Sequence, residues 1–127
     1  MEKVVEKMLH VIIEGKTYSE SDIQHYFSPH YIQIVDETRL DFAGFKQHIH
    51  KLKELIESVE ITILNTASRG NTVFTKHLVS SVFKDGTCYK HKVMAEFTME
   101  AGKIIRCEEL TLLLEGLEQG KQLGAVV

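Results

Sequence analysis

The hydrophobic pattern of the first part of the chain predicts two amphipathic helices. Over residues 2–14, apolar side chains recur at the i, i+3, i+4, i+7 spacing that places them on one helical face, and Gly15 ends the run. Ser19 is followed three positions later by Asp22, which resembles a capping box and predicts a short second helix over 20–27. Both helices therefore have one face to bury.

A short strand and a longer helix are predicted next. Residues 31–36 are rich in β-forming side chains, and Pro29 separates them from the preceding helix. Asp41 is a suitable N-cap for a third helix that extends to about residue 57. The apolar side chains of this helix share one face: Phe42, Phe45, Ile49, Leu52, Leu55 and Ile56.

From residue 59 onwards the pattern alternates with a period of two, which predicts a meander of four antiparallel strands. The last three strands are expected over 72–84, 87–99 and 103–114. Three-residue connectors are expected at Arg69-Gly70-Asn71, Lys84-Asp85-Gly86 and Glu100-Ala101-Gly102.

The length of the first connector decides which side of its strand faces the interior. With three residues, the side chains that share a face with His77 are Ile61, Ile63 and Asn65. A two-residue connector would turn Thr62 and Leu64 to that face and bury less apolar surface. The three-residue form is therefore favoured.

Pairing Phe83 with Thr87 and Met99 with Lys103 sets the register of the last three strands. One row of side chains then contains His77, Val93 and Glu109, and the next row contains Val79, His91 and Thr111. On the other face, Glu96 is expected opposite Arg106 as a favourable charge pair. Two histidines and one carboxylate thus point to the same side of the sheet.

The order of elements predicts an α+β fold. A strongly twisted sheet of this kind curls into a cone around the N-terminal helices and leaves a cavity above the third helix; the expected sheet is mixed but mainly an antiparallel meander. The 127 residues fit one domain over 1–127, ending in a polar tail over 116–127.

Composition narrows the expected partners and compartment. A net charge of -3 with scattered Lys and Arg argues against nucleic acid as a partner. No apolar run is long enough to span a bilayer, and the N-terminus lacks the apolar region of a signal peptide. Cys88 and Cys107 fall on opposite faces of the predicted sheet, so no disulfide and a cytoplasmic protein are expected.

Several segments resemble one family. They are the opening helix, YIQIVDETRLDFAGFKQHI, NTVFTKH after a glycine turn, AGKIIRCEELT on the last strand, and the tail LLEGLEQGKQLG. Together they resemble the nuclear-transport-factor-2-like superfamily, in particular its SnoaL-like branch, whose members include polyketide cyclases, ketosteroid isomerases, dehydratases, epoxide hydrolases and noncatalytic binding domains. The resemblance implies a cone-shaped pocket for a small molecule without a cofactor.

The resemblance and the predicted register together single out Glu109 and His77. In SnoaL-like cyclases, an acid five residues after the Ile of the GKI motif is the general acid/base, and counting from Ile104 reaches Glu109. Apolar surroundings are expected to raise its pKa. His77 is expected to orient or polarise a substrate carbonyl. The alternative is that both residues are structural, with His77 paired to Asn65, Thr75 or a water.

The candidate ligand-binding residues are Asn65, His91, Val93, Cys107, Asp36 and Tyr31. Asp36 resembles the catalytic base of ketosteroid isomerases, but their second acid would fall near Ala95, which argues against that reaction and favours a turn residue. His77, His91 and Glu109 match a 2-His-1-carboxylate metal set in composition. Their spread over three strands argues against it, so no metal is expected.

The outer sheet face is expected to be a homodimer interface, because it is too polar for a core and too apolar for a solvent face. Its residues are Lys76, Leu78, Ser80, Val82, Lys92, Met94, Glu96, Arg106, Glu108 and Leu110. The alternative is an ordinary open sheet face. The expected function is binding of a small apolar or aromatic molecule, with cyclase- or isomerase-type acid/base chemistry at Glu109. The alternative is a noncatalytic ligand-binding or dimerisation module.

Overall fold

Six strands form one curved, mixed sheet in the order β2-β1-β6-β5-β4-β3 in the computed structural model of the chain, which describes residues 1–116. The strands are β1 (Phe27–Val35), β2 (Thr38–Leu40), β3 (Ile56–Arg69), β4 (Thr72–Phe83), β5 (Cys88–Glu100) and β6 (Lys103–Glu115). The predicted α+β cone is confirmed. The predicted polar tail lies outside the described residues, apart from Gly116.

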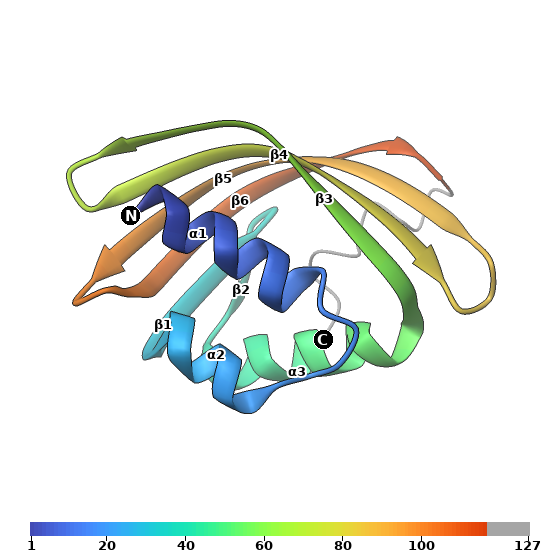
Figure 1. Cartoon of the computed structure of the whole chain (residues 1–127), viewed down its shortest axis with the longest axis horizontal. Helices are drawn as coiled ribbons and strands as arrows, with labels where there is room; N and C mark the ends of the chain where they lie inside the picture. The colour runs from blue at the N-terminus through green and yellow to red at the C-terminus, as the bar shows by residue number, and fades with distance from the viewer. Residues whose placement is uncertain (117–127) are drawn as a thin grey trace.

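The helices lie against the concave side of this sheet (Figure 1). They are α1 (Glu2–Met8), α2 (Glu20–Tyr26) and α3 (Phe42–Leu55), and α1 continues as a π-helical turn, η1 (Leu9–Ile13). Ser19 and Asp41 cap α2 and α3 by accepting from the backbone N–H groups of Asp22 and Gly44. Over residues 1–116, no helix combines the length and apolar character that crossing a membrane requires.

The first strand is longer than its hydrophobic pattern predicts. β1 begins at Phe27 instead of residue 31 and contains Pro29, which lies where its parallel pairing with β6 is irregular, between Phe27 and Ile32. A missing N–H is tolerated there because the ladder is interrupted. β2 was not predicted: it is three residues long and pairs with β1 across the turn Asp36-Glu37, whose φ angles are 47° and 73°.

The β4–β5 hairpin has the predicted register. His77 lies opposite Val93 and Val79 opposite His91, and Gly86 has a φ of 90° in the three-residue connector. These pairs place both histidines on the concave face, where both side chains are buried.

The predicted register of the β5–β6 hairpin is wrong. The turn has two residues, Ala101-Gly102, with positive φ at both, so that Glu100 pairs with Lys103. A bulge then shifts the pairing by one more residue. The two shifts together equal two residues, so Glu109 keeps its concave orientation but lies opposite Ala95. The expected charge pair is also wrong, because Glu96 faces Glu108.

The β3–β4 hairpin also combines a two-residue turn with a bulge that shifts the pairing by one residue. Its turn has two residues, and a bulge between Ile63 and Asn65 returns Ile63 and Ile61 to the face of His77, as predicted. Asn65 lies between the turn and this bulge, where the pairing is still shifted by one residue. It therefore pairs with Lys76 and is exposed. The prediction that Asn65 lines the cavity is therefore wrong.

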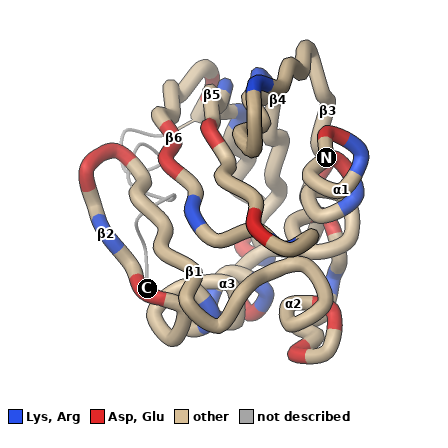
Figure 2. Tube along the Cα trace, turned by 90° about the vertical axis from the view of Figure 1, so that its left-hand side faces the viewer, with Lys and Arg blue, Asp and Glu red and all other residues tan. Residues whose placement is uncertain are grey.

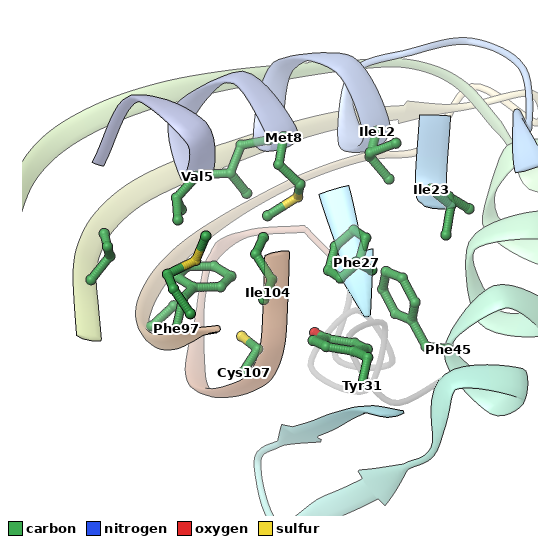
Figure 3. Packing of buried hydrophobic residues seen from close by; sticks show 14 of the residues in the cluster. Val5, Met8, Ile12, Ile23, Phe27, Tyr31, Phe45, Phe97, Ile104 and Cys107 are labelled. Atoms are coloured by element: carbon green, nitrogen blue, oxygen red, sulfur yellow. The ribbon is translucent and has the colours of Figure 1, made fainter. Parts of the chain in front are cut away.

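The core fills the space between the helices and the concave face (Figure 3). Phe27, Tyr31 and Phe45 form a ring cluster with centroids 4.6–4.8 Å apart. Val5, Met8 and Ile12 contribute from the N-terminal helical segment, and Phe97, Ile104 and Cys107 contribute from the sheet. Part of this core also lines a cavity above α3: Met8, Phe27, Tyr31, Phe45, Phe97 and Cys107.

Candidate functional site

A cavity of about 160 Å³ lies between α3, η1 and the concave sheet face. Its apolar lining includes Leu9, Phe27, Phe45, Ile49, Val93 and Phe97. Polar side chains reach it from the sheet and from α3, among them Glu109, His77, His91, Ser81 and His48. A mostly apolar cavity with a few polar groups is the usual form of a small-molecule site.

Glu109 is the carboxylic acid that β6 contributes to this lining. It lies between Ala95 of β5 and Val35 of β1. Desolvation raises the pKa of Glu109 to about 7, and the negative charge of Asp36 adds to the rise. Among the described residues, no side chain makes a hydrogen bond or ion pair with its carboxyl group. Near neutral pH the acid therefore exists in both protonated and ionised forms.

His77 is a neutral imidazole on the same concave face. Its side chain is 3% exposed, and desolvation lowers the pKa of His77 to about 4. Nδ1 lies 3.0 Å from the hydroxyl of Thr75, which belongs to the row of Ala95 and Glu109. When the Thr75 hydroxyl donates to Nδ1, the ring proton lies on Nε2 and is available to an acceptor in the cavity.

Four of the six candidate ligand-binding residues line the cavity: Tyr31, His91, Val93 and Cys107. The Tyr31 hydroxyl donates to Gln33 Oε1 over 2.9 Å. Burial raises the pKa of the Cys107 thiol well above its usual value, so the thiol stays protonated and unreactive. Cys107 thus contributes to the apolar wall of the cavity. Cys88 is exposed and both cysteines are free thiols.

Asp36 and Asn65 do not line the cavity. Asp36 lies in the β1–β2 turn, where its carboxylate accepts hydrogen bonds from the backbone N–H of Thr111, over 2.8 Å, and from the Thr111 hydroxyl. Asp36 anchors the turn to β6. It does not line the cavity, but its negative charge raises the pKa of Glu109. In Figure 2 this acidic turn is the red bend between β1 and β2.

The sequence reasoning missed two polar residues that α3 brings to the cavity, His48 and Lys53. His48 is 4% exposed, and desolvation lowers its pKa to about 4. Lys53 Nζ donates to the carbonyl oxygens of Ile13, over 2.9 Å, and Gly15; burial lowers the pKa of Lys53 to about 8. The signal for His48 was its position three residues after Phe45, on the buried face of the helix.

The possible metal set does not assemble among residues 1–116. No three His, Cys, Asp or Glu side chains in this part of the chain come together in a way that would hold an ion. His77, His91 and Glu109 line the same cavity from three strands but do not form such a group.

No protein-family model matches the chain. Uncharacterized protein C11D3.04c from Schizosaccharomyces pombe is 26% identical over 125 residues, which cover 98% of this chain and 95% of that protein. The two chains are thus similar over nearly their full lengths.

Solved structures are similar in fold at low sequence identity. An LEH-like epoxide hydrolase from M. tuberculosis has a TM-score of 0.73 at 12% identity, covering 87% of this chain and 81% of that chain. IdmH, a putative polyketide cyclase from Streptomyces antibioticus, has a TM-score of 0.73 at 9% identity, with coverage of 97% and 95%. An NTF2-like protein of unknown function from Exiguobacterium has a TM-score of 0.72 at 13% identity, with coverage of 86% and 98%. The chain therefore has the nuclear-transport-factor-2-like fold that its sequence resembles.

Proposed function

We propose that the chain binds a small, mostly apolar or aromatic molecule in the cavity and that Glu109 exchanges a proton with it as a general acid/base. The observation that carries this proposal is a carboxylic acid with a pKa of about 7 in an apolar cavity, without a hydrogen-bond partner among the described residues. A group with a pKa near the working pH is both a usable acid and a usable base.

His77 supports the proposal as a second polar group on the sheet wall. Its neutral ring can donate a hydrogen bond to a carbonyl oxygen, which stabilises negative charge that develops when Glu109 removes a proton from the neighbouring carbon. Ala95 lies directly opposite Glu109, so this position contributes no second acid. The proposed chemistry therefore uses one carboxyl group and one imidazole.

The fold neighbours are compatible with this class of function. They include an LEH-like epoxide hydrolase and a putative polyketide cyclase. At 9–12% identity they share only the fold with this chain. The class of substrate is therefore inferred from the residues that line the cavity.

The test has two stages. Native mass spectrometry of the protein purified from cells identifies the retained molecule. That molecule is then incubated with the protein in D₂O, and mass spectrometry follows deuterium incorporation at carbon. We expect Glu109→Gln to lower the exchange rate by about 10²- to 10⁴-fold without loss of binding. Glu108→Gln, an exposed neighbour on the other face, is the matched control.

Exchange at the wild-type rate in Glu109→Gln would reject the role of this acid. A noncatalytic binding module is the second candidate, and the bond between His77 and Thr75 favours it because one nitrogen of the imidazole is already engaged within the protein. Retention of a ligand with no exchange in the wild-type protein would support that candidate.

We also propose that the outer sheet face pairs two copies of the chain. Met94 and Leu110 lie opposite each other on this face and are 58% and 62% exposed. Leu112, two residues further along β6, is 59% exposed. Adjacent apolar side chains of this exposure are typical of protein interfaces. The lysines and glutamates beside them are typical of an interface rim.

A further inference from the structure

Gln33 brings to the cavity a hydrogen-bond donor that no described residue uses. It lies on β1, is 6% exposed and forms part of the cavity lining. Its Oε1 accepts from the Tyr31 hydroxyl over 2.9 Å, whereas its Nε2 makes no hydrogen bond within residues 1–116. The protein therefore satisfies only one end of this buried amide.

The free nitrogen of Gln33 remains accessible. Within residues 1–116, the side-chain nitrogen or oxygen that is both unpaired and sealed from any accessible surface is Nδ1 of His48. Nε2 of Gln33 is unpaired but is not sealed in this way, so it keeps accessible surface. The flanking side chains of Tyr31, Val35 and Cys107 are buried, so this surface belongs to the cavity that Gln33 lines. A bound molecule can therefore reach the donor.

Tyr31 fixes the direction of the Gln33 amide. Desolvation raises the pKa of the Tyr31 hydroxyl well above its usual value, and the neighbouring Cys107 and Glu109 add to the rise, so the hydroxyl stays protonated and needs an acceptor. Figure 3 shows this hydroxyl directed toward Cys107, whose sulfur is only a weak acceptor. The amide oxygen is the stronger acceptor, so Oε1 is directed to Tyr31 and Nε2 to the cavity.

Gln33 lies on the strand next to Glu109. In the parallel ladder of β1 and β6, Gln33 is beside Cys107 and Val35 is beside Glu109. Residues two apart along a strand are separated by about 7 Å, so the amide donor and the carboxyl group occupy neighbouring rows of the concave wall. His77 lies on β4, with β5 between it and Glu109.

We propose that Gln33 is a specificity-determining residue whose Nε2 donates a hydrogen bond to a carbonyl oxygen of the bound molecule, with Tyr31 as the positioning residue that directs this donor. The inference rests on the proposed function and adds the ligand class: an apolar or aromatic ketone or a related carbonyl compound. A hydrogen bond to a carbonyl oxygen stabilises the charge that develops when the neighbouring carbon loses a proton, which is the exchange proposed for Glu109.

Two probes of nearly equal shape test this inference by calorimetry. Acetophenone and α-methylstyrene differ in one group, C=O against C=CH₂, and cavities of about 150 Å³ accommodate single aromatic rings. The quantity measured is the ratio of the two affinities in each protein, because the hydration of the free probes then cancels between proteins.

Gln33→Leu should weaken acetophenone binding relative to α-methylstyrene by roughly five- to tenfold. Tyr31→Phe keeps the ring but frees the amide to turn, so it should shift the ratio in the same direction by a smaller factor. Gln47→Leu, an exposed position on α3, is the matched control and should leave the ratio unchanged.

A second measurement uses the wild-type protein alone. In ¹⁵N-labelled protein, the side-chain NH₂ resonances of Gln33 should move downfield with acetophenone relative to their positions with α-methylstyrene, since ring-current effects are common to both probes. Equal positions with the two probes would overturn the inference. So would a ratio that is unchanged in Gln33→Leu, or one that shifts in His77→Leu instead.

These outcomes separate the inference from the proposed function. Binding of both probes with an unchanged ratio in Gln33→Leu would reject the role of Gln33 and leave cavity binding and the acid/base role of Glu109 in place. Absence of binding for both probes would reject cavity binding by this class of molecule and the role of Gln33 with it.

Discussion

The backbone N–H of Asp36 donates to the carbonyl oxygen of Glu109 over 3.0 Å, which joins the end of β1 to the functional region of β6. The same contact brings the carboxylate of Asp36 close enough to raise the pKa of Glu109. Asp36 is thus a residue outside the cavity wall that tunes an acid inside it.

Asp36→Asn should lower the pKa of Glu109 from about 7, because it removes a nearby negative charge while keeping an oxygen that accepts from Thr111. The measurement is a ¹³C-carboxyl NMR titration. Glu37→Gln removes a charge from the adjacent turn position and serves as the control. A Glu109 titration curve that is unchanged in Asp36→Asn would contradict the electrostatic link.

Glu109 should also make stability depend on pH. Its pKa is about 7 in the folded chain and 4.5 ordinarily, so between these values the folded state binds more protons than the unfolded state. Its contribution to stability is therefore complete below pH 4.5 and falls as the pH rises to 7. The loss is of order 3 kcal/mol at most.

Urea unfolding of wild type and Glu109→Gln at pH 5 and pH 8 measures this dependence. We expect the variant to gain stability relative to wild type between the two pH values. His48 and His77, with pKa values lowered from 6.5 to about 4, act in the opposite direction, since stability is lost as the pH falls from 6.5 to 4. Their effect is common to both proteins and cancels in the difference. A difference that is the same at both pH values would contradict the raised pKa of Glu109.

Thr75→Val should destabilise the fold by about 1–3 kcal/mol, because it removes the hydroxyl that pairs with the buried Nδ1 of His77. Urea unfolding gives the free energy, and ¹⁵N NMR of the imidazole reports the change at Nδ1. Thr62→Val, the same substitution at an exposed position of β3, should change stability much less. Equal effects of the two substitutions would show that the hydrogen bond contributes little.

Met94→Lys should convert the proposed homodimer to a monomer, because it buries a charge at the centre of the outer sheet face. Light scattering coupled to size-exclusion chromatography gives the mass of each species. Val11→Lys changes a 41% exposed apolar residue on η1 and should leave the mass unchanged. A wild-type monomer, or a Met94→Lys dimer, would rule out this interface.

Local pattern predicted the helices well, since capping and apolar spacing act within a few residues. The N-caps Ser19 and Asp41 are confirmed, and α3 ends at Leu55, close to the predicted boundary. The three-residue strand β2 was missed because so short an element has no periodicity of its own. It depends on pairing with β1 across a turn of two non-glycine residues with positive φ.

The concave orientation of Glu109 was predicted correctly by way of a wrong register. The turn and the bulge in the β5–β6 hairpin each shift the pairing by one residue, and two shifts restore the side of the sheet while changing the opposing residue. In the β3–β4 hairpin, Asn65 lies between the turn and the bulge, so only the shift from the turn applies to it. A single shift moves Asn65 to the opposite side of the sheet from the predicted one. Bulges bend and twist strands as the curvature of the whole sheet requires, and the alternating pattern does not encode that curvature.

The sequence by itself determined the classes of element and the two sides of most strands, because side-chain periodicity and capping are local physics. Only the tertiary structure decided that β1 runs parallel to β6, which sets Asp36 beside Glu109, and that His48 lines the cavity while its Nδ1 is buried without a partner. These relationships join residues far apart in the chain. They arise when the sheet closes over the helices, so no short segment contains them.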